Sequence, residues 1–129
     1  MLQLIGHEVD LIALACHMRI LSPEFVGQYL LRMINLNHSC LPAFVGAKPY
    51  HQALARGVKL IGPTSHYVTA TPDEGPIIEQ GVVRASHRDT VEDMMRKGCD
   101  LEKVVLARAV RWHLENRILV YQNKTVMFS

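Results

Sequence analysis

The stretch 33–46 constrains the fold more than any other part of this chain. Its first residues form a short apolar run that predicts a buried strand, and Asn35 and Asn37 interrupt this run at alternate positions. Pro42 and Gly46 then mark a loop. A buried strand that carries polar side chains to the edge of a sheet is typical of α/β enzymes, which keep their chemistry there.

A second stretch, 66–78, supplies an acidic residue. A β-rich run that begins at His66 leads into the sequence Pro72-Asp73-Glu74-Gly75-Pro76, so Asp73 lies in a turn with rigid flanking residues. A further strand is expected after Pro76. We therefore expect side-chain amides from the first stretch to face the carboxylate of the second.

Size and composition indicate one globular domain. A chain of 129 residues buries about two thirds of its unfolded surface, and 49% apolar and 20% charged residues are ordinary values. The net charge of +2, without a basic run, does not favour a nucleic-acid partner. The longest apolar run, 11–16, is far shorter than the ~20 residues that cross a bilayer, so no membrane partner is expected.

The cysteines argue against a disulfide framework or a zinc ribbon. Cys16, Cys40 and Cys99 are odd in number and share no Cys-x-x-Cys spacing. The N-terminus lacks a basic region, and Glu8 and Asp10 interrupt any signal-peptide core. These features predict a protein of the reducing cytoplasm, in which Cys40 is a small apolar side chain.

Hydrophobic periodicity and turn residues predict the order of helices and strands. The expected elements are a helix end at 1–7, a strand at 10–15, a helix at 23–31, a strand around Ile34, a helix at 50–56, strands at 58–62 and 65–70 around Pro63, a strand at 76–85 that can bend at Gly81, a helix at 90–115 that Gly98 can bend, and a hairpin of 117–121 with 124–128. A capping box at Thr90 begins the long helix. This order predicts an α/β fold with an antiparallel section in its sheet.

Long motifs along the whole chain resemble one enzyme family. They are Asn-Leu-Asn-His-Ser-Cys-Leu-Pro at 35–42, Pro-Tyr-His-Gln-Ala at 49–53, Gly-Pro-Thr-Ser-His-Tyr-Val-Thr at 62–69, Asp-Glu-Gly-Pro-Ile-Ile-Glu-Gln at 73–80, His-Arg-Asp-Thr-Val-Glu-Asp at 87–93, the run 105–115, and Asn-Lys-Thr-Val at 123–126. The chain thereby resembles the 10-formyltetrahydrofolate hydrolases (formyltetrahydrofolate deformylases). Other folate-dependent formyltransferases are looser relatives.

The resemblance implies a Rossmann-like formyltransferase fold, a mixed sheet flanked by helices, in which residues 1–129 form a single partial catalytic domain. In that family the N-terminal half of the domain and a regulatory domain precede the region matched by Val9. The strand at 10–15 would then present an open edge. We expect a homo-oligomer that forms through this edge or through an exposed helix.

Four catalytic positions follow from the resemblance. Asn35 matches the donor to the developing oxyanion, Asp73 matches the aspartate that orients or deprotonates water, and His66 matches a histidine close to that aspartate. Asn37 occupies the position of the family's catalytic histidine and cannot titrate, so we expect low activity. Strand alternation places Asn35 and Asn37 on one face and His38 on the other, so His38 is not expected to act instead.

The resemblance also implies a folate site. Its pterin end would lie against residues of two segments, Met18, Arg19, Ile20 and Leu21 in the first and Val68, Thr69 and Gly75 in the second. No cofactor is expected, since 10-formyltetrahydrofolate is the substrate. No metal is expected either, because the other histidines lack metal-ligand spacing.

Three functions remain open from the sequence. The first is hydrolysis of 10-formyltetrahydrofolate to formate and tetrahydrofolate, which would feed purine biosynthesis and one-carbon metabolism. The second is formyl transfer to an amine such as glycinamide ribonucleotide. The third is a non-catalytic fragment or pseudoenzyme, which the amide at position 37 favours.

Overall fold

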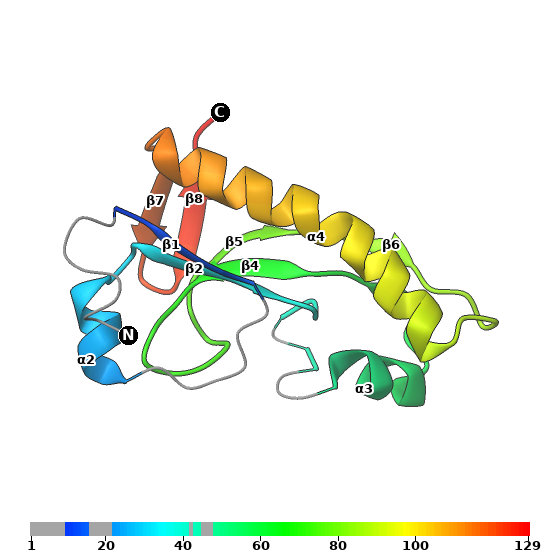
Figure 1. Cartoon of the computed structure of the whole chain (residues 1–129). Coiled ribbons are helices and arrows are strands. Elements are labelled where there is room, and N and C mark those ends of the chain that lie inside the picture. The colour runs from blue at the N-terminus through cyan, green and yellow to red at the C-terminus, as the bar shows by residue number, and fades with distance from the viewer. Residues whose placement is uncertain (1–9, 16–21, 42, 45–47) are drawn as a thin grey trace.

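A computed structural model describes residues 10–15, 22–41, 43–44 and 48–129 of the chain (Figure 1). The elements in chain order are β1 (Ile12–Ala15), α2 (Pro23–Gln28), β2 (Met33–Asn37), α3 (Pro49–Arg56), β3 (Leu60–Ile61), β4 (Thr64–Tyr67), β5 (Ile77–Gln80), β6 (Val83–Arg84), α4 (Val91–Leu114), β7 (Ile118–Tyr121) and β8 (Lys124–Met127). The helix end expected at 1–7 lies outside the described residues.

A four-stranded mixed sheet forms the centre of the fold. Its strand order is β1-β2-β4-β5. β1 pairs with β2 in parallel, whereas β2–β4 and β4–β5 are antiparallel. Two small sheets, β3–β6 and β7–β8, accompany it. The predicted α/β class with a mixed sheet flanked by helices is therefore confirmed.

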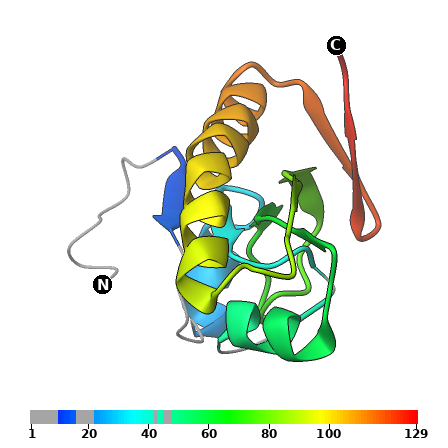
Figure 2. The ribbon, with the colours of Figure 1, turned by 90° about the vertical axis from the view of Figure 1, so that its right-hand side faces the viewer.

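The two faces of the sheet are covered by different helices. Met33 and Ile34 are both fully buried, and successive strand residues point to opposite faces. Ile34 packs in one cluster with Ala109 of α4, whereas Met33 packs with Phe25 and Val26 of α2. Figure 2 shows the β7–β8 hairpin on the side of the molecule away from β1. The α2 face is the one that receives the polar side chains of β2.

Local signals account for the helix ends. The Ser22 side chain accepts a hydrogen bond from the amide of Phe25, and Pro23 follows as the first residue of α2. Thr90 and Asp93 form the predicted capping box at the start of α4. These caps satisfy amide groups that no preceding helical turn could pair.

The strand expected at 76–85 is instead two strands in two sheets. β5 ends before Gly81 and β6 pairs with β3, so this expectation is corrected. The break is a close backbone crossing, since a Cβ at Gly62 would lie 1.8 Å from the carbonyl oxygen of Gly81. The Gly81 amide donates to the Pro63 carbonyl at 3.0 Å, which holds the chain at this crossing.

Gly98 does not divide the long helix, because α4 runs continuously from 91 to 114. The glycine has a packing role instead. A Cβ at this position would lie 1.8 Å from Oη of Tyr50, so the bare Cα is what allows α3 to approach α4.

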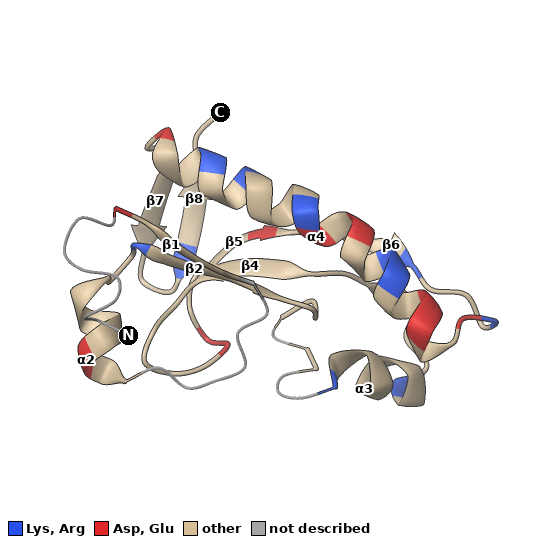
Figure 3. Cartoon of the chain, in the orientation of Figure 1, with Lys and Arg blue, Asp and Glu red and all other residues tan. Residues whose placement is uncertain are grey.

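Figure 3 shows acidic and basic segments in turn along the first part of α4, whereas the charged residues in its last turns are basic. Within the described part of the chain, no helix is both long enough and apolar enough to span a membrane.

Candidate active site

Strands β2 and β4 place polar side chains on one face of the sheet. In their antiparallel pairing Asn35 lies opposite His66, and Asn37 lies opposite Thr64. Directly opposite residues project to the same face, which here is the α2 face because Asn35 and Asn37 alternate with the α4-facing Ile34. The ladder between β4 and β5 is irregular at Ser65 and His66, as is common beside active sites.

A hydrogen bond joins the first stretch to the second. Nδ2 of Asn37 donates to Oδ1 of Asp73 at 2.8 Å. The other end of the same amide, Oδ1, accepts from the Ser39 amide at 3.0 Å and from the Ser39 hydroxyl at 2.8 Å. Asn37 is buried and these contacts fix which way its amide points. Among the described residues, Asn37 thus links the carboxylate of Asp73 to Ser39.

The loop after β2 and the turn that carries Asp73 both have defined backbones. Thr64 Oγ1 donates to the Ser39 carbonyl at 2.7 Å. This bond anchors Ser39, which donates to Asn37, on strand β4. Asp73 has φ 59°, a left-handed conformation that aspartate tolerates better than most residues. The turn packs closely, since a Cβ at Gly75 would lie 1.7 Å from the Tyr67 carbonyl oxygen.

His66 lies beneath this turn and is only 2% exposed. Its Nδ1 contacts the Tyr67 carbonyl oxygen at 2.9 Å, and because a carbonyl only accepts, Nδ1 carries the hydrogen. Nε2 is buried without a hydrogen-bond partner among the described residues. Burial lowers the pKa of His66, while the bond to Tyr67 and the charge of Asp73 act in the opposite direction. The imidazole is therefore held neutral beside an acid.

His38 points away from this group of side chains, as strand alternation predicted. Its Nδ1 pairs with Oε1 of Glu102 on α4, and its ring lies 5.8 Å from the ring of Tyr50. His38 therefore tethers the loop after β2 to α4. It does not replace an imidazole at position 37.

An open pocket of about 640 Å³ borders Asp73, within the size range of small-molecule sites. The described residues that line it are Leu41, Asp73, Glu74, Gly75, Ile77, Asn123, Lys124 and Thr125. The tip of the β7–β8 hairpin forms one wall. Asn123 donates to the Glu74 carbonyl at 2.9 Å and Thr125 to the Ile77 carbonyl at 2.6 Å, so two hydrogen bonds tie the hairpin to the turn and to β5.

The residues expected to bind the pterin lie in different places. Met18, Arg19, Ile20 and Leu21 lie outside the described residues. Val68 packs against the α2 cluster and gives its amide to the Met33 carbonyl, and the Thr69 hydroxyl donates to the Thr71 carbonyl. Gly75 lines the pocket beside Asp73. Their role in folate binding stays a prediction.

Cys40 follows the site loop but is not an activated nucleophile. Its side chain is partly buried, and burial raises the pKa of the thiol. In the part of the chain that the structure describes, no three His, Cys, Asp or Glu side chains lie together in a way that could hold a metal ion.

Sequence reasoning missed three residues that support the site, Ser39, Thr64 and Glu102. A hydroxyl two residues after an asparagine is a known turn pattern, so Ser39 could have been found from local sequence. Thr64 and Glu102 act through contacts between distant segments, which no local pattern shows.

Comparison with known proteins identifies the family. The family model described as formyl transferase matches residues 2–110. The chain belongs to the formyl transferase family. Its relatives include the formyltetrahydrofolate deformylase of Synechocystis sp., 62% identical over 123 residues that make up 95% of this chain and 43% of that protein. The Bacillus subtilis protein of the same name is 56% identical over 95% of this chain and 41% of its own length.

Solved structures of this formyl transferase family share its fold. A formyltetrahydrofolate deformylase from Pseudomonas syringae pv. tomato has a TM-score of 0.94 at 59% identity, over 98% of this chain and 43% of that one. Glycinamide ribonucleotide transformylase 1 from Symbiobacterium toebii has a TM-score of 0.92 at 38% identity, over 99% of this chain and 59% of that one. The formyltransferase fold is thus established, and the chain spans less than half the length of the deformylases it matches.

Proposed function

We propose that the side chains gathered on the α2 face take part in hydrolysis of 10-formyltetrahydrofolate to formate and tetrahydrofolate. The observation that carries this proposal is the hydrogen bond from Asn37 to Asp73, made beside the facing pair of Asn35 and His66. Hydrolysis of a formyl amide needs an oxyanion donor, a group that handles the water proton and a proton for the leaving nitrogen. The amide of Asn35, the imidazole of His66 and the carboxylate of Asp73 are chemically suited to these tasks.

The names of the relatives support the substrate. Proteins named formyltetrahydrofolate deformylase match 95% or more of this chain at 53–62% identity. The pocket beside Asp73 is large enough for the reacting part of a folate. The 10-formyl group would enter between Asp73 and the hairpin tip.

The activity of this chain is expected to be low because of position 37. An asparagine orients Asp73 but cannot accept or release a proton at neutral pH. Removal of a general acid or base lowers rates by about 10² to 10⁴. The substitution Asn37→His should raise formate release by a factor in that range, since an imidazole N–H can also donate to Asp73.

The test is single-turnover formate release from 10-formyltetrahydrofolate without any added amine. Asn37→Gln is the matched control, because it changes the side chain but introduces no titrating group, and its rate should not exceed that of the unaltered chain. If Asn37→His retains the native circular dichroism and releases formate no faster, the proposed site is wrong.

Formyl transfer to an amine is a second candidate, favoured by the likeness to glycinamide ribonucleotide transformylase 1 at a TM-score of 0.92. A transferase would need its amine acceptor, so formate release in the absence of amine separates the two activities. A non-catalytic role is the third candidate. It predicts neither formate release nor formyl transfer, even with the histidine at position 37.

The biological setting follows from the chemistry. Formate and tetrahydrofolate released by this reaction would supply purine biosynthesis and balance the one-carbon pool. We place this activity in the cytoplasm, where Cys40 and Cys99 would stay reduced as the structure has them.

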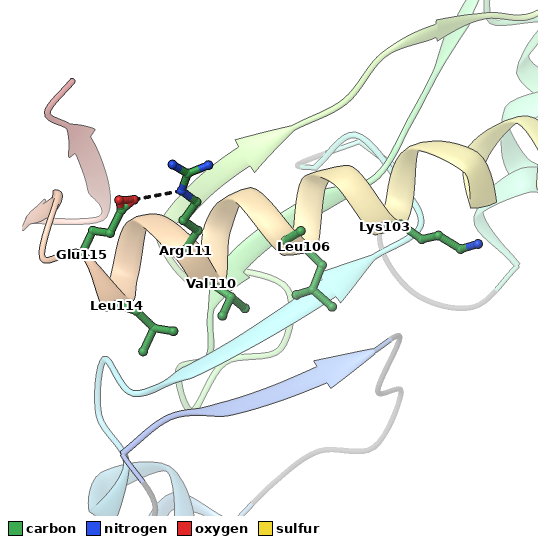
Figure 4. Close-up of a pocket in the computed structure, with 7 residues that line it drawn as sticks. Lys103, Leu106, Val110, Arg111, Leu114 and Glu115 are labelled. Atoms are coloured by element: carbon green, nitrogen blue, oxygen red, sulfur yellow. Dashed lines mark hydrogen bonds and ion pairs between the residues drawn. The ribbon is translucent and has the colours of Figure 1, made fainter.

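We also propose that the chain self-associates through β1 and α4. Within the described residues β1 has a neighbour on one side only, so its other edge is open. Figure 4 shows Leu106, Val110 and Leu114 pointing from α4 to the side where β1 lies. Together with Ala107 they form the apolar part of a groove of about 570 Å³, which Lys103, Arg111 and Glu115 also line. Leu114 is 62% exposed. A second copy would cover both features.

Self-association should appear as a concentration-dependent mass in sedimentation equilibrium. Leu114→Glu, which places a charge in the groove, should weaken it. Leu60→Glu is the control, because Leu60 is similarly exposed at 52% but lies outside the groove. A mass that stays monomeric at all concentrations would contradict the proposal.

A further inference from the structure

We infer that Nε2 of His66 is the atom that accepts the proton of the attacking water in this chain. The inference rests on the proposed hydrolysis and assigns its proton acceptor. It follows from three observations on the α2 face of the sheet, namely the tautomer of His66, its unpartnered ring nitrogen and the lack of another imidazole beside Asp73 among the described residues.

The tautomer is set by the backbone. Nδ1 of His66 donates to the Tyr67 carbonyl at 2.9 Å, so the neutral ring has its lone pair on Nε2. The Asp73 turn lies close to the ring, since a Cβ at Gly75 would lie 3.3 Å from Nδ1. The backbone therefore fixes Nε2 as an acceptor.

That acceptor has no donor among the described residues, although the side chain is only 2% exposed. Buried polar atoms in native proteins almost always have a partner, and one that lacks it needs an explanation. A water molecule is the donor that this site needs for its reaction. Asn35, the expected oxyanion donor, lies directly across the strand pair from His66.

Two neighbouring side chains are unsuited to this role. Asn37 does not titrate, and its amide is already bonded to Asp73 and Ser39. His38 pairs with Glu102 on the opposite side of the strand. His66 is thus the imidazole that remains beside Asp73.

The electrostatic surroundings suit a base. Burial lowers the pKa of His66, which keeps the ring neutral and able to accept a proton at pH 7. The charge of Asp73 raises the same pKa and stabilises the imidazolium once it forms. The tetrahedral intermediate, the imidazolium and the carboxylate would then lie side by side.

The water O–H bond breaks and its proton moves to Nε2, while the water oxygen bonds to the formyl carbon and the carbonyl electron pair moves to oxygen, facing Asn35. When the oxyanion collapses, the bond from carbon to N10 breaks and Nε2 returns the proton to N10. Formic acid leaves and ionises, and the ring is neutral again.

Nitrogen NMR of the 15N-labelled full chain tests the tautomer without any need for activity. His66→Gln assigns the resonance by removing it. At pH 7 the spectrum should show a hydrogen on Nδ1 and none on Nε2, and addition of 10-formyltetrahydrofolate should shift the Nε2 resonance. A hydrogen on Nε2 would overturn the inference, whatever the activity of the chain.

Kinetics supply the second readout. The rate of formate release should fall on acidification below about pH 6.5, where an imidazole with a lowered pKa gains its proton. His66→Gln should lower kcat by about 10²-fold or more with little change in KM, and it should abolish this acid limb. His87→Gln, at an exposed turn, is the matched control and should keep both.

The possible failures are distinguishable. An unchanged rate and an unchanged acid limb in His66→Gln would overturn the inference while the hydrolase function stands. Absence of formate from the unaltered chain and from Asn37→His would contradict the proposed function, and with it the role of His66 as a base.

Discussion

Replacement of Asn37 by aspartate tests the contact on which the site depends. Asn37→Asp keeps the size of the side chain and the oxygen that accepts from Ser39, but it puts a second carboxylate where Nδ2 now lies 2.8 Å from Asp73. Two charges at that distance repel by about 6 kcal/mol at an effective dielectric constant near 20. The protein can escape this cost by binding one proton.

Proton binding limits the loss of stability. The ordinary pKa of an aspartate is about 3.9, so protonation of one carboxyl at pH 7 costs about 4 kcal/mol. The variant should therefore lose at most about 4 kcal/mol of its free energy of unfolding at pH 7, and less where solvent screens the pair. Repulsion raises the pKa of the introduced carboxyl in the folded state, so the lost stability returns as the pH falls toward 4.

Urea unfolding of the variant and the unaltered chain at several pH values between 4 and 7 measures the difference. The difference in free energy of unfolding between the two proteins should change with pH by at most about 1.4 kcal/mol per pH unit, and it should become smaller at acid pH. Asn116→Asp makes the same change of charge at an exposed turn and should alter stability by about 0.5 kcal/mol or less. A variant as stable as the unaltered chain at pH 7 would refute the contact between Asn37 and Asp73.

Three further predictions concern the surroundings of the site. Gly75→Ala puts a Cβ 1.7 Å from the Tyr67 carbonyl and should cost about 1–3 kcal/mol by urea unfolding. His113 contacts the Tyr67 hydroxyl at 2.7 Å, and burial lowers its pKa. The free energy of unfolding should therefore decrease as the pH is lowered below about 6.5, and thermal melts of His113→Gln should show a smaller decrease. Thr90→Ala removes the N-cap of α4 and should cost about 1 kcal/mol, with Thr71→Ala as the exposed control.

Much of the fold was predictable because local signals agree with the tertiary structure. The capping box at Thr90 and the apolar stripe that follows it fixed α4 to within one residue at each end. The apolar run around Ile34 predicted β2. The exception was the strand at 76–85, where the close approach of Gly62 to Gly81 divides β5 from β6. That approach joins distant segments, so no periodicity in either one shows it.

The candidate site was predictable in part. Alternation along β2 correctly put Asn35 and Asn37 on one face and His38 on the other. The meeting of Asn37 with Asp73 spans 36 positions of sequence. The strand and turn patterns predicted that amides of the first stretch face this acid, and the family motifs added which residues take part. The bond from His66 to the Tyr67 carbonyl joins neighbouring residues, but no sequence pattern shows which way the ring points.

The most direct test of the proposed site is formate release by Asp73→Asn. This change removes the charge but keeps an oxygen that can accept from Asn37, so the fold should be little affected. In a single-turnover assay with 10-formyltetrahydrofolate and no added amine, we expect the variant to release formate about 10² to 10⁴ times more slowly than the unaltered chain. Equal rates from the two proteins would contradict the account, because the acid would then play no part in the chemistry.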